Sequence, residues 1–420
     1  MSKWLGLGTF IFQAAHAGNT ITVDSLGDQS EAGLTTLREA MVQANNDPGS
    51  TITFDETLFS TPQTITLENG DLHVFSDMSI TGPGAELLTL DGDNLSRILT
   101  IDKLLNTSRY VELDSGDLED IQVTVSGITF TQGNGESSAN NTRGGCISTL
   151  DNLILTDSVV TGCTGSNGGG IFSRSDALTI ENSTVSHNTA SSKGGGVYRR
   201  GGASEVFHST ITGNSGNQGG GVYLKQAGVV FLNSTIANNR GDTGGGIQLV
   251  SGSPRTIIKN STIVNNIGIG LAVRNTEMHN TIIAGNTGGD CSFFITGSDN
   301  QNNLDTDGSC DVEAINHITV ADPLLEPLAN FGGPTATHRP LPGSPVIDRG
   351  DDFLCTDRDQ RGVNRPQDGD SDNNPVCDIG AVELAETEDI PQEIIYKDGF
   401  DVFNCGGFVA GNNETNRGCR

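Results

Sequence analysis

The amino-acid sequence predicts an all-β chain, a right-handed parallel β-helix with a helical cap at its N-terminal end and an irregular cap at its C-terminal end. Three observations favour this fold class. Glycine triplets recur at a nearly constant interval, and a second motif recurs with the same period. The composition is rich in turns, with 56 glycines among 420 residues. A short, constant period is typical of a solenoid in which each repeat is one coil.

The glycine triplets begin 26, 25 and 25 residues apart, at Gly168, Gly194, Gly219 and Gly244. In the same register, a Ser-Thr pair precedes Val or Ile, and an asparagine follows three residues later, at Asn188, Asn214, Asn239 and Asn266. The intervening stretches are β-branched and alternating, which predicts short strands joined by tight turns. We expect the asparagines to occupy a corner with left-handed backbone and the glycines to supply positive φ at another corner.

The N-terminal segment has two parts. Residues 1–17 contain Lys3, an apolar run and Ala15-His16-Ala17, the pattern of a signal peptide cleaved after Ala17. Residues 18–50 are expected to cap the first coil, because Leu37, Ala40, Met41 and Ala44 fall at helical spacing within residues 35–46. A cap is needed because the end of a β-helix exposes unpaired backbone groups.

The coils are predicted over residues 51–330, as about ten or eleven turns stacked about 4.8 Å apart. Residues 331–383 are rich in Gly, Pro and Asp and break the period, so we expect them to close the other end. Residues 384–420 form a tail that contains the last two cysteines.

Eight cysteines, an even number, favour an oxidising compartment. Neighbours in the sequence are the natural partners, although eight cysteines allow about 105 pairings. The expected pairs are Cys146 with Cys163, Cys291 with Cys310, Cys355 with Cys377, and Cys405 with Cys419.

The formal charge of −29, from 23 Lys and Arg against 52 Asp and Glu, disfavours nucleic acid and anionic lipid as partners. No stretch after Ala17 reaches the length of about 18 apolar residues that a membrane span requires. We therefore expect a soluble mature chain.

Several end segments carry a family resemblance. Leu34-Thr35-Thr36-Leu37-Arg38-Glu39-Ala40 resembles the CSLREA segment of bacterial exported β-helix proteins, with Thr35 and Thr36 in place of its Cys and Ser. Residues 332–383 resemble the choice-of-anchor Q domain through Ser344–Asp348, Asp359–Gly362 and Cys377–Glu383. The coils resemble polymorphic-outer-membrane-protein and pectate-lyase-like repeats. These resemblances imply a secreted or cell-surface rod.

Strand alternation selects candidate ligand-binding residues. If the first residue after each glycine triplet points inward, the second and fourth point outward. The second positions form the column Phe172, Tyr198, Tyr223, Gln248 and Ala272. The fourth positions form the column Arg174, Arg200, Lys225, Val250 and Arg274.

An aromatic column beside a basic column, on an acidic chain, favours an acidic polysaccharide as ligand. Aromatic faces stack on sugar rings, and Arg or Lys pairs with carboxylate or sulfate. Phe172, Tyr198 and Tyr223 with Arg174, Arg200 and Lys225 are the candidate ligand-binding residues. The same pattern is also typical of aromatics that stabilise neighbouring coils and cations that keep the surface soluble.

Our leading hypothesis is thus a non-catalytic, adhesive or binding protein at the cell surface. A polysaccharide lyase acting on a uronate-containing glycan is the alternative, and it needs a base plus a group that neutralises the carboxylate. The candidates are Lys225, Arg200, Tyr198 and His208, of which His208 replaces the Asn of its column. Glycoside hydrolysis is less favoured, because the acidic residues of the central coils share no column.

A calcium site is conceivable in the stretch Asp368-Gly369-Asp370-Ser371-Asp372, since alternating carboxylates supply the oxygen ligands that Ca²⁺ prefers. A solvated acidic loop is the favoured interpretation of the same stretch, because the EF-hand pattern is incomplete. Asp368, Asp370 and Asp372 are the candidate ligands.

Overall fold

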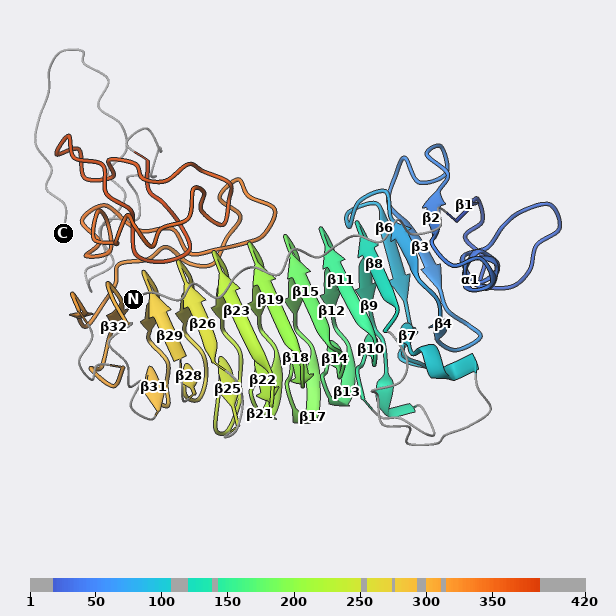
Figure 1. Cartoon of the computed structure of the whole chain (residues 1–420), viewed down its shortest axis with the longest axis horizontal. Coiled ribbons are helices and arrows are strands. Elements are labelled where there is room, and N and C mark those ends of the chain that lie inside the picture. Colours follow the sequence, from blue (N-terminus) through green and yellow to red (C-terminus); the bar gives the residue numbers. More distant parts are fainter. Residues whose placement is uncertain are drawn as a thin grey trace, which may run out of the picture. The chain divides into compact units, whose positions relative to one another are not determined.

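The computed structural model describes residues 18–106, 120–137, 143–250, 255–273, 276–292, 300–310 and 315–385. Within these residues the chain winds into a parallel β-helix, and successive coils add one strand to each of three long sheets (Figure 1). All strand pairs between named strands are parallel, because each coil returns to the same side of the helix one step further along the axis. The predicted all-β architecture is confirmed.

The three long sheets are named A, B and C here, and a short sheet D accompanies the central coils. Sheet A contains β1 (Thr20–Val23), β2 (Ser50–Phe54), β5 (Met78–Thr81), β8 (Gln122–Ser126), β11 (Asn152–Thr156), β15 (Ala177–Glu181), β19 (Ala203–Phe207), β23 (Gly228–Leu232), β26 (Thr256–Lys259) and β29 (Thr276–His279). Sheet B contains β3 (Gln63–Thr66), β6 (Leu88–Asp91), β9 (Thr129–Thr131), β12 (Val159–Thr161), β16 (Thr184–Ser186), β20 (Thr210–Thr212), β24 (Thr235–Ala237), β27 (Thr262–Val264), β30 (Ile282–Ala284), β32 (Leu304–Asp305) and β33 (Ile318–Thr319).

Sheet C contains β4 (Leu72–Val74), β7 (Leu99–Ile101), β10 (Ile147–Thr149), β14 (Ile171–Ser173), β18 (Val197–Arg200), β22 (Val222–Lys225), β25 (Ile247–Leu249), β28 (Leu271–Ala272) and β31 (Cys291–Ser292). Sheet D contains β13 (Thr164–Asn167), β17 (Thr189–Lys193) and β21 (Ser215–Gln218). Two short 3-10 helices, η1 (Lys103–Asn106) and η2 (Gly135–Ser137), interrupt the early coils.

The interior is filled by stacked aliphatic side chains. The residue after each glycine triplet points inward as predicted, and each of these residues is at most 3% exposed. They are Ile171, Val197, Val222 and Ile247, followed by Leu271 in the next coil. Because equivalent side chains recur in every coil, each one packs on its own copies above and below, which makes the hydrophobic core continuous along the axis.

The asparagine column forms a buried ladder inside the helix rather than the left-handed corner that we expected. The Nδ2 of Asn188 donates to Oδ1 of Asn214, and the Nδ2 of Asn214 donates to Oδ1 of Asn239, each at 3.0 Å. The left-handed backbone lies one residue earlier, for example at His187 (φ 54°) and Asn238 (φ 58°). That residue turns the chain, and the turn directs the following asparagine inward, where its amide satisfies buried groups of neighbouring coils.

The glycine triplets fulfil two requirements. Gly194 has φ of 65°, as predicted for a corner. Gly195 is needed for close approach, because a Cβ there would lie 2.5 Å from the carbonyl carbon of Ser215 in the next coil. The triplet therefore allows the protruding sheet D strands to lie against the coils.

The N-terminal cap is formed as predicted. Helix α1 (Leu37–Asn46) begins at Thr36, whose side chain accepts a hydrogen bond from the Glu39 N–H while the Glu39 carboxylate accepts one from the Thr36 N–H. Its apolar side, which contains Ala40 and Met41, is buried against the first strands. Residues 18–50 also contribute β1, which extends sheet A by one strand.

Residues 331–383, which we expected to close the end of the coils, contact the coils along their side. They lie along the side of sheet B, and Figure 1 shows this orange-to-red segment beside the yellow coils. The Thr235 hydroxyl contacts the Gln360 side-chain oxygen at 2.6 Å, and the Ala381 N–H donates to the Thr262 hydroxyl at 3.0 Å. Stacked threonines on sheet B offer a row of hydroxyls, which an irregular segment can use to satisfy its backbone.

Three of the four predicted disulfides are present, Cys146–Cys163, Cys291–Cys310 and Cys355–Cys377. Cys405 and Cys419 lie outside the described residues, as does the predicted signal peptide of residues 1–17. None of the helices in the described part of the chain is long and apolar enough to cross a membrane.

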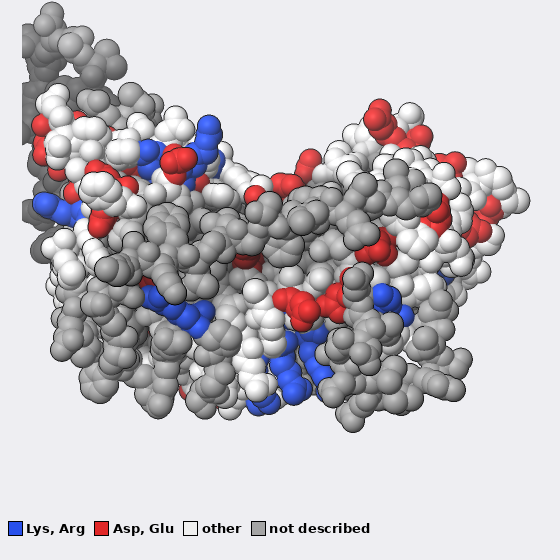
Figure 2. Space-filling model, in the orientation of Figure 1, with Lys and Arg blue, Asp and Glu red and all other residues white. Residues whose placement is uncertain are grey.

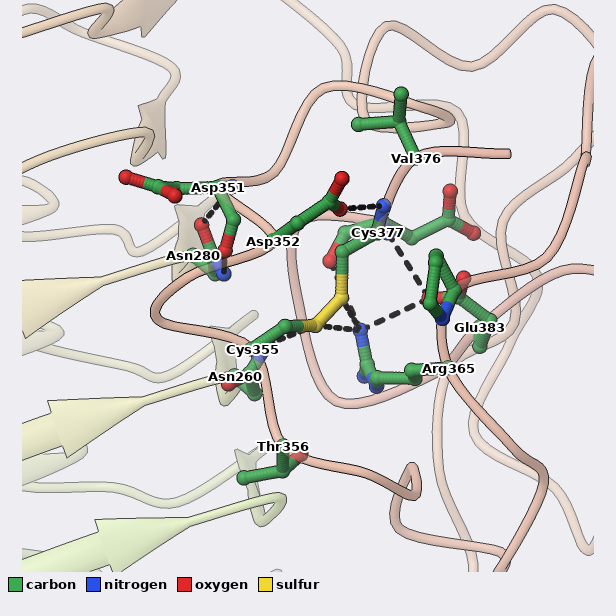
Figure 3. The surroundings of a disulfide bond; sticks show 12 residues. Asn260, Asn280, Asp351, Asp352, Cys355, Thr356, Arg365, Val376, Cys377 and Glu383 are labelled. Atoms are coloured by element: carbon green, nitrogen blue, oxygen red, sulfur yellow. Dashed lines mark hydrogen bonds and ion pairs between the residues drawn. A yellow bond between two sulfur atoms is a disulfide. The ribbon is translucent and has the colours of Figure 1, made fainter. Parts of the chain in front are cut away.

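The Cys355–Cys377 bond lies in a buried network that holds the C-terminal segment together (Figure 3). The guanidinium of Arg365 donates to the Glu383 carboxylate at 3.0 Å, and both side chains are fully buried. Burial and the charge of Glu383 raise the pKa of Asp378 well above its ordinary value. Cys377, Asp378 and Glu383, which belong to a segment that resembles the choice-of-anchor Q domain, therefore take part in the buried contacts of the C-terminal segment.

Candidate functional site

The aromatic column predicted on sheet C is present on the outer side of that sheet. Phe172, Tyr198 and Tyr223 are aligned by strand register and form an apolar cluster separate from the interior core. Ring centroids lie 5.1 Å apart for Phe172 and Tyr198 and 5.3 Å apart for Tyr198 and Tyr223, with planes inclined by only 13° and 14°. Because coils repeat about every 4.8 Å, equivalent rings fall at stacking distance.

The rings are not the open platform that we expected. Their residues are 3%, 8% and 3% exposed, because each ring covers the face of its neighbour. Two cations also lie against the stack, Arg143 over the Phe172 ring and Lys193 over the Tyr223 ring, each 5.2 Å from the ring centroid. Sugar rings therefore cannot stack on these faces, and the role of the aromatics is chiefly structural.

The basic column remains accessible. Arg174 is exposed, and Arg200 and Lys225 are half-buried neighbours in register on β18 and β22. Val250 ends the column and packs against the aromatic cluster, whereas Arg274 lies outside the described residues. Figure 2 shows Lys and Arg side chains gathered over the part of the coils where sheets C and D lie in Figure 1.

A second row of polar and basic side chains flanks the aromatic cluster on the sheet D side. Register aligns Arg143 with Asn167, Asn167 with Lys193, and Lys193 with Gln218. Two of these four are the cations over the rings. The aromatic cluster therefore lies between two rows that both contain positive charge, on a chain whose net charge is −29.

The Tyr198 phenol lies among these charges. Burial and the neighbouring Tyr223 raise its pKa, while Arg200, Lys193 and Arg143 act in the opposite direction. The raised pKa keeps the hydroxyl protonated at neutral pH, so it can donate a hydrogen bond but is a poor base. Among the described groups that act on the Tyr198 pKa, the cationic side chains of the two rows are the base candidates.

His208 is not part of this group. It occupies a left-handed turn (φ 47°) between sheets A and B, in the position held by Asn182 and Asn233 in neighbouring coils. Its carbonyl accepts from the Thr335 hydroxyl, and its Nε2 lies 3.2 Å from the Asn233 amide. Burial lowers its pKa. The catalytic candidacy of His208 is therefore corrected, because its turn faces the C-terminal segment and not sheet C.

The structure also gathers carboxylates that sequence reasoning missed. Asp102, Asp120 and Asp151 share the corner between sheets C and A, and burial raises the pKa of each. The charge of Asp176 adds to the effect at Asp120. Asp102, Asp151 and Asp176 each follow a sheet C strand within three residues, a regularity that could have been noticed, whereas Asp120 enters from another coil position.

The acidic loop groups a different set of carboxylates from the predicted one. Oxygens of Asp348, Asp368 and Asp370 lie within 4.8 Å of one another. Asp372 is not in this group, and its backbone N–H donates to the carboxylates of Asp368 and Asp370. Burial and the charges of Asp370 and Asp368 raise the pKa of Asp348. The candidate calcium ligands are therefore Asp348, Asp368 and Asp370.

Comparison with known proteins supports the fold. A family model described as a right handed beta helix region matches residues 113–307. The crystal structure of the pectate lyase Pel9A has a TM-score of 0.54, with 14% identity over 87% of this chain and 96% of that chain. The structure of the PL6 family alginate lyase AlyGC gives a TM-score of 0.27, with 12% identity over 82% of this chain and 58% of that chain. No curated protein matches this chain.

The coil region is thus a right-handed parallel β-helix, as the sequence predicted. Pel9A shares that fold over nearly its whole length. The resemblance of the end segments to the CSLREA and choice-of-anchor Q families stays a prediction.

Proposed function

We propose that this chain binds an acidic polysaccharide along the outer side of sheet C. The observation that carries the proposal is the accessible pair Arg200 and Lys225, which strand register aligns beside a rigid aromatic stack, with the exposed Arg174 directly after β14 in the preceding coil. Neighbouring cations are about one coil spacing apart, so a polymer with a carboxylate or sulfate on each sugar can pair with several of them at once. On a chain with a net charge of −29, an anionic ligand is attracted to the places where cations gather.

The aromatic stack contributes differently from our first expectation. We expect it to support the cations beside it and to present the Tyr198 hydroxyl as a donor. Rigid support lowers the entropic cost of binding, because the side chains that contact the polymer are already ordered.

The proposal includes export to the cell surface. Three disulfides are typical of an oxidising compartment, and residues 1–17 match a signal peptide in sequence. A surface-located, glycan-binding β-helix would be adhesive, because one coil array offers many weak contacts along one polymer.

Affinity electrophoresis in gels that contain polygalacturonate tests the binding. We expect the wild-type protein to be retarded and the Arg200→Gln/Lys225→Gln variant to bind about tenfold more weakly. The matched control is Arg255→Gln/Lys259→Gln, which removes the same charge from sheet A, where both cations pair with Glu277. Equal retardation of both variants would show that the cations of sheet C do not form the binding site.

A polysaccharide lyase is the second candidate, favoured by the fold shared with a pectate lyase and by the cations around Tyr198. Such an enzyme removes the proton beside a uronate carboxylate, and Lys225 or Arg200 is the candidate base or carboxylate partner. Incubation with polygalacturonate and alginate, followed by absorbance of the unsaturated product, separates the two functions. Product that disappears in Lys225→Ala or Arg200→Ala would establish catalysis in place of simple binding.

A further inference from the structure

The cations beside the aromatic stack accompany three successive coils. Strand register places one ring of the stack in each of β14, β18 and β22, so the rings mark these coils. Two of the cations belong to the row beside sheet D, and three belong to the outer column of sheet C. They are Arg143 and Lys193 in the first row and Arg174, Arg200 and Lys225 in the second.

The two cations of the sheet D row each reach one coil forward. Arg143 precedes β10, but its guanidinium lies 5.2 Å from the ring centroid of Phe172 in β14, the next strand of sheet C. Lys193 precedes β18, but its ammonium lies 5.2 Å from the ring centroid of Tyr223 in β22. Their charges therefore lie beside the rings of the first and the last coil of the stack.

The charge pattern is centred on Tyr198. The coils of β14 and β22 each have two cations, one from each row, and the central coil has Arg200 beside the Tyr198 phenol. Arg200, Lys193 and Arg143 all act on the pKa of that phenol, so cations from both rows lie near one point. In the described part of the chain, Lys193, Arg200 and Lys225 have no carboxylate within ion-pair distance. Their charges are therefore available to a ligand.

The sheet C column of cations ends at an apolar side chain on both sides. Leu150 occupies its position in the coil of β10, and Val250 occupies it in the coil of β25. Both are half-buried and pack against the aromatic cluster. A polyanion that runs parallel to the helix axis therefore meets the cations of this column over three coils and not in the coil on either side.

We propose that these three coils select glycans with a carboxylate on each of three consecutive sugars, one sugar to a coil, a selectivity that rests on the polysaccharide binding proposed above. Coils repeat about every 4.8 Å, and a sugar unit of an extended chain has a similar length, so consecutive carboxylates meet successive cations. In a glycan whose acidic and neutral sugars alternate, a neutral sugar opposite the central coil would leave Arg200 without a carboxylate.

Isothermal titration calorimetry of the full-length protein tests this selectivity with galacturonate oligomers of two, three and four units and with a hyaluronan hexamer. The hyaluronan hexamer also has three carboxylates, but a neutral sugar separates each from the next. The galacturonate trimer should bind about tenfold more tightly than the dimer or the hyaluronan hexamer. The tetramer should gain only about twofold over the trimer, because it has two registers on a site of three coils.

Val250→Lys should extend the site by one coil, because residue 250 continues the column after Lys225. The gain from trimer to tetramer should then increase to about tenfold. Thr64→Lys is the matched control, since it adds the same charge at an exposed position of sheet B and should leave the gain unchanged. Leu150→Lys extends the opposite end of the column and decides if Val250→Lys fails to fold.

Failure of this selectivity differs from failure of the proposed binding. If neither polygalacturonate nor any oligomer binds, the proposed function is wrong and the selectivity with it. If polygalacturonate binds, the binding stands, and four results would overturn the selectivity alone. These are an absence of binding by all three galacturonate oligomers, equal affinity for dimer and trimer, equal affinity for the trimer and the hyaluronan hexamer, and a gain from trimer to tetramer that is the same in the lysine variants as in the wild type.

Discussion

Arg199 is the largest fully buried side chain in the described part of the chain, and it lies between two residues of the candidate site. Its guanidinium is turned inward and donates to the hydroxyls of Ser204 at 2.5 Å and Ser173 at 3.1 Å. Burial lowers its pKa to about 10, although the charge of Asp176 opposes the shift. A cation that is solvated by serines instead of paired with a carboxylate is costly to bury.

The first prediction concerns the free energy of unfolding when the polar pair Arg199 and Ser204 is replaced by the residues at the same positions of the next coil. Arg199 aligns with Leu224, and Ser204 aligns with Val229. The double variant Arg199→Leu/Ser204→Val copies that coil and should be at least as stable as the wild type. Ser204→Val alone should lose about 1–3 kcal/mol, because the Arg199 Nε–H is left without an acceptor.

Urea unfolding of both single variants and of the double variant measures the interaction as a double-mutant cycle. A double variant less stable than either single variant would show that the guanidinium network stabilises the coil.

The C-terminal segment is the element whose position matters most for function. Its irregular backbone is held to sheet B by polar contacts such as those of Thr235 with Thr337 and of Asn280 with Asp351. It therefore leaves sheet C uncovered and creates a cleft of about 380 Å³ whose walls include Val264 and His338. A cap at the end of the coils would not have created this cleft.

Calcium binding is predicted within this segment. Excess CaCl₂ should raise the melting temperature by about 2–4 °C, because an ion that binds only the folded state stabilises it. Asp348→Asn should abolish the increase, since Asp348 belongs to the carboxylate cluster. Asp372→Asn is the matched control and should keep it. Melting curves with CaCl₂ and with chelator measure the effect. If the increase is lost in Asp372→Asn but kept in Asp348→Asn, the ligands include Asp372, as the sequence predicted, and not Asp348.

The coil is the repeating unit on which the stability of the β-helix depends. Each coil contacts mainly the one before and the one after it, so the stability of the array is approximately a sum over coils and their interfaces. The buried asparagine ladder and the stacked aliphatic core both follow this rule. The proposed binding strip of sheet C also depends on the coil repeat, because its length is set by the number of coils that carry a cation.

We therefore expect the fold to tolerate deletion of one whole coil. Removal of Ala177–Gly202 joins Asp176 to Ala203, which occupies the register position of Ala177. The shortened chain should fold, keep the contacts of sheet B with the C-terminal segment, and unfold cooperatively. Removal of Ala177–Ser186 should prevent folding, because every later side chain would change its position in the coil. Circular dichroism and thermal melting compare the two, and equal behaviour would contradict a coil-based architecture.

The sequence by itself determined the coil period, the helix behind Thr36, the inward and outward columns of sheet C, and three disulfides. These features depend on local chemistry and on repetition: alternation sets which side of a strand Tyr198 or Arg200 occupies, and a coil places residues about 25 positions apart in contact.

Only the tertiary structure decided what those columns are used for. Tyr198 is covered because Phe172 and Tyr223 stack on it at the coil spacing. Asp348 joins the acidic cluster in place of Asp372, and His338 meets the coils, because an irregular segment folds back along sheet B. Such contacts depend on packing between segments that share no period, so no sequence pattern encodes them.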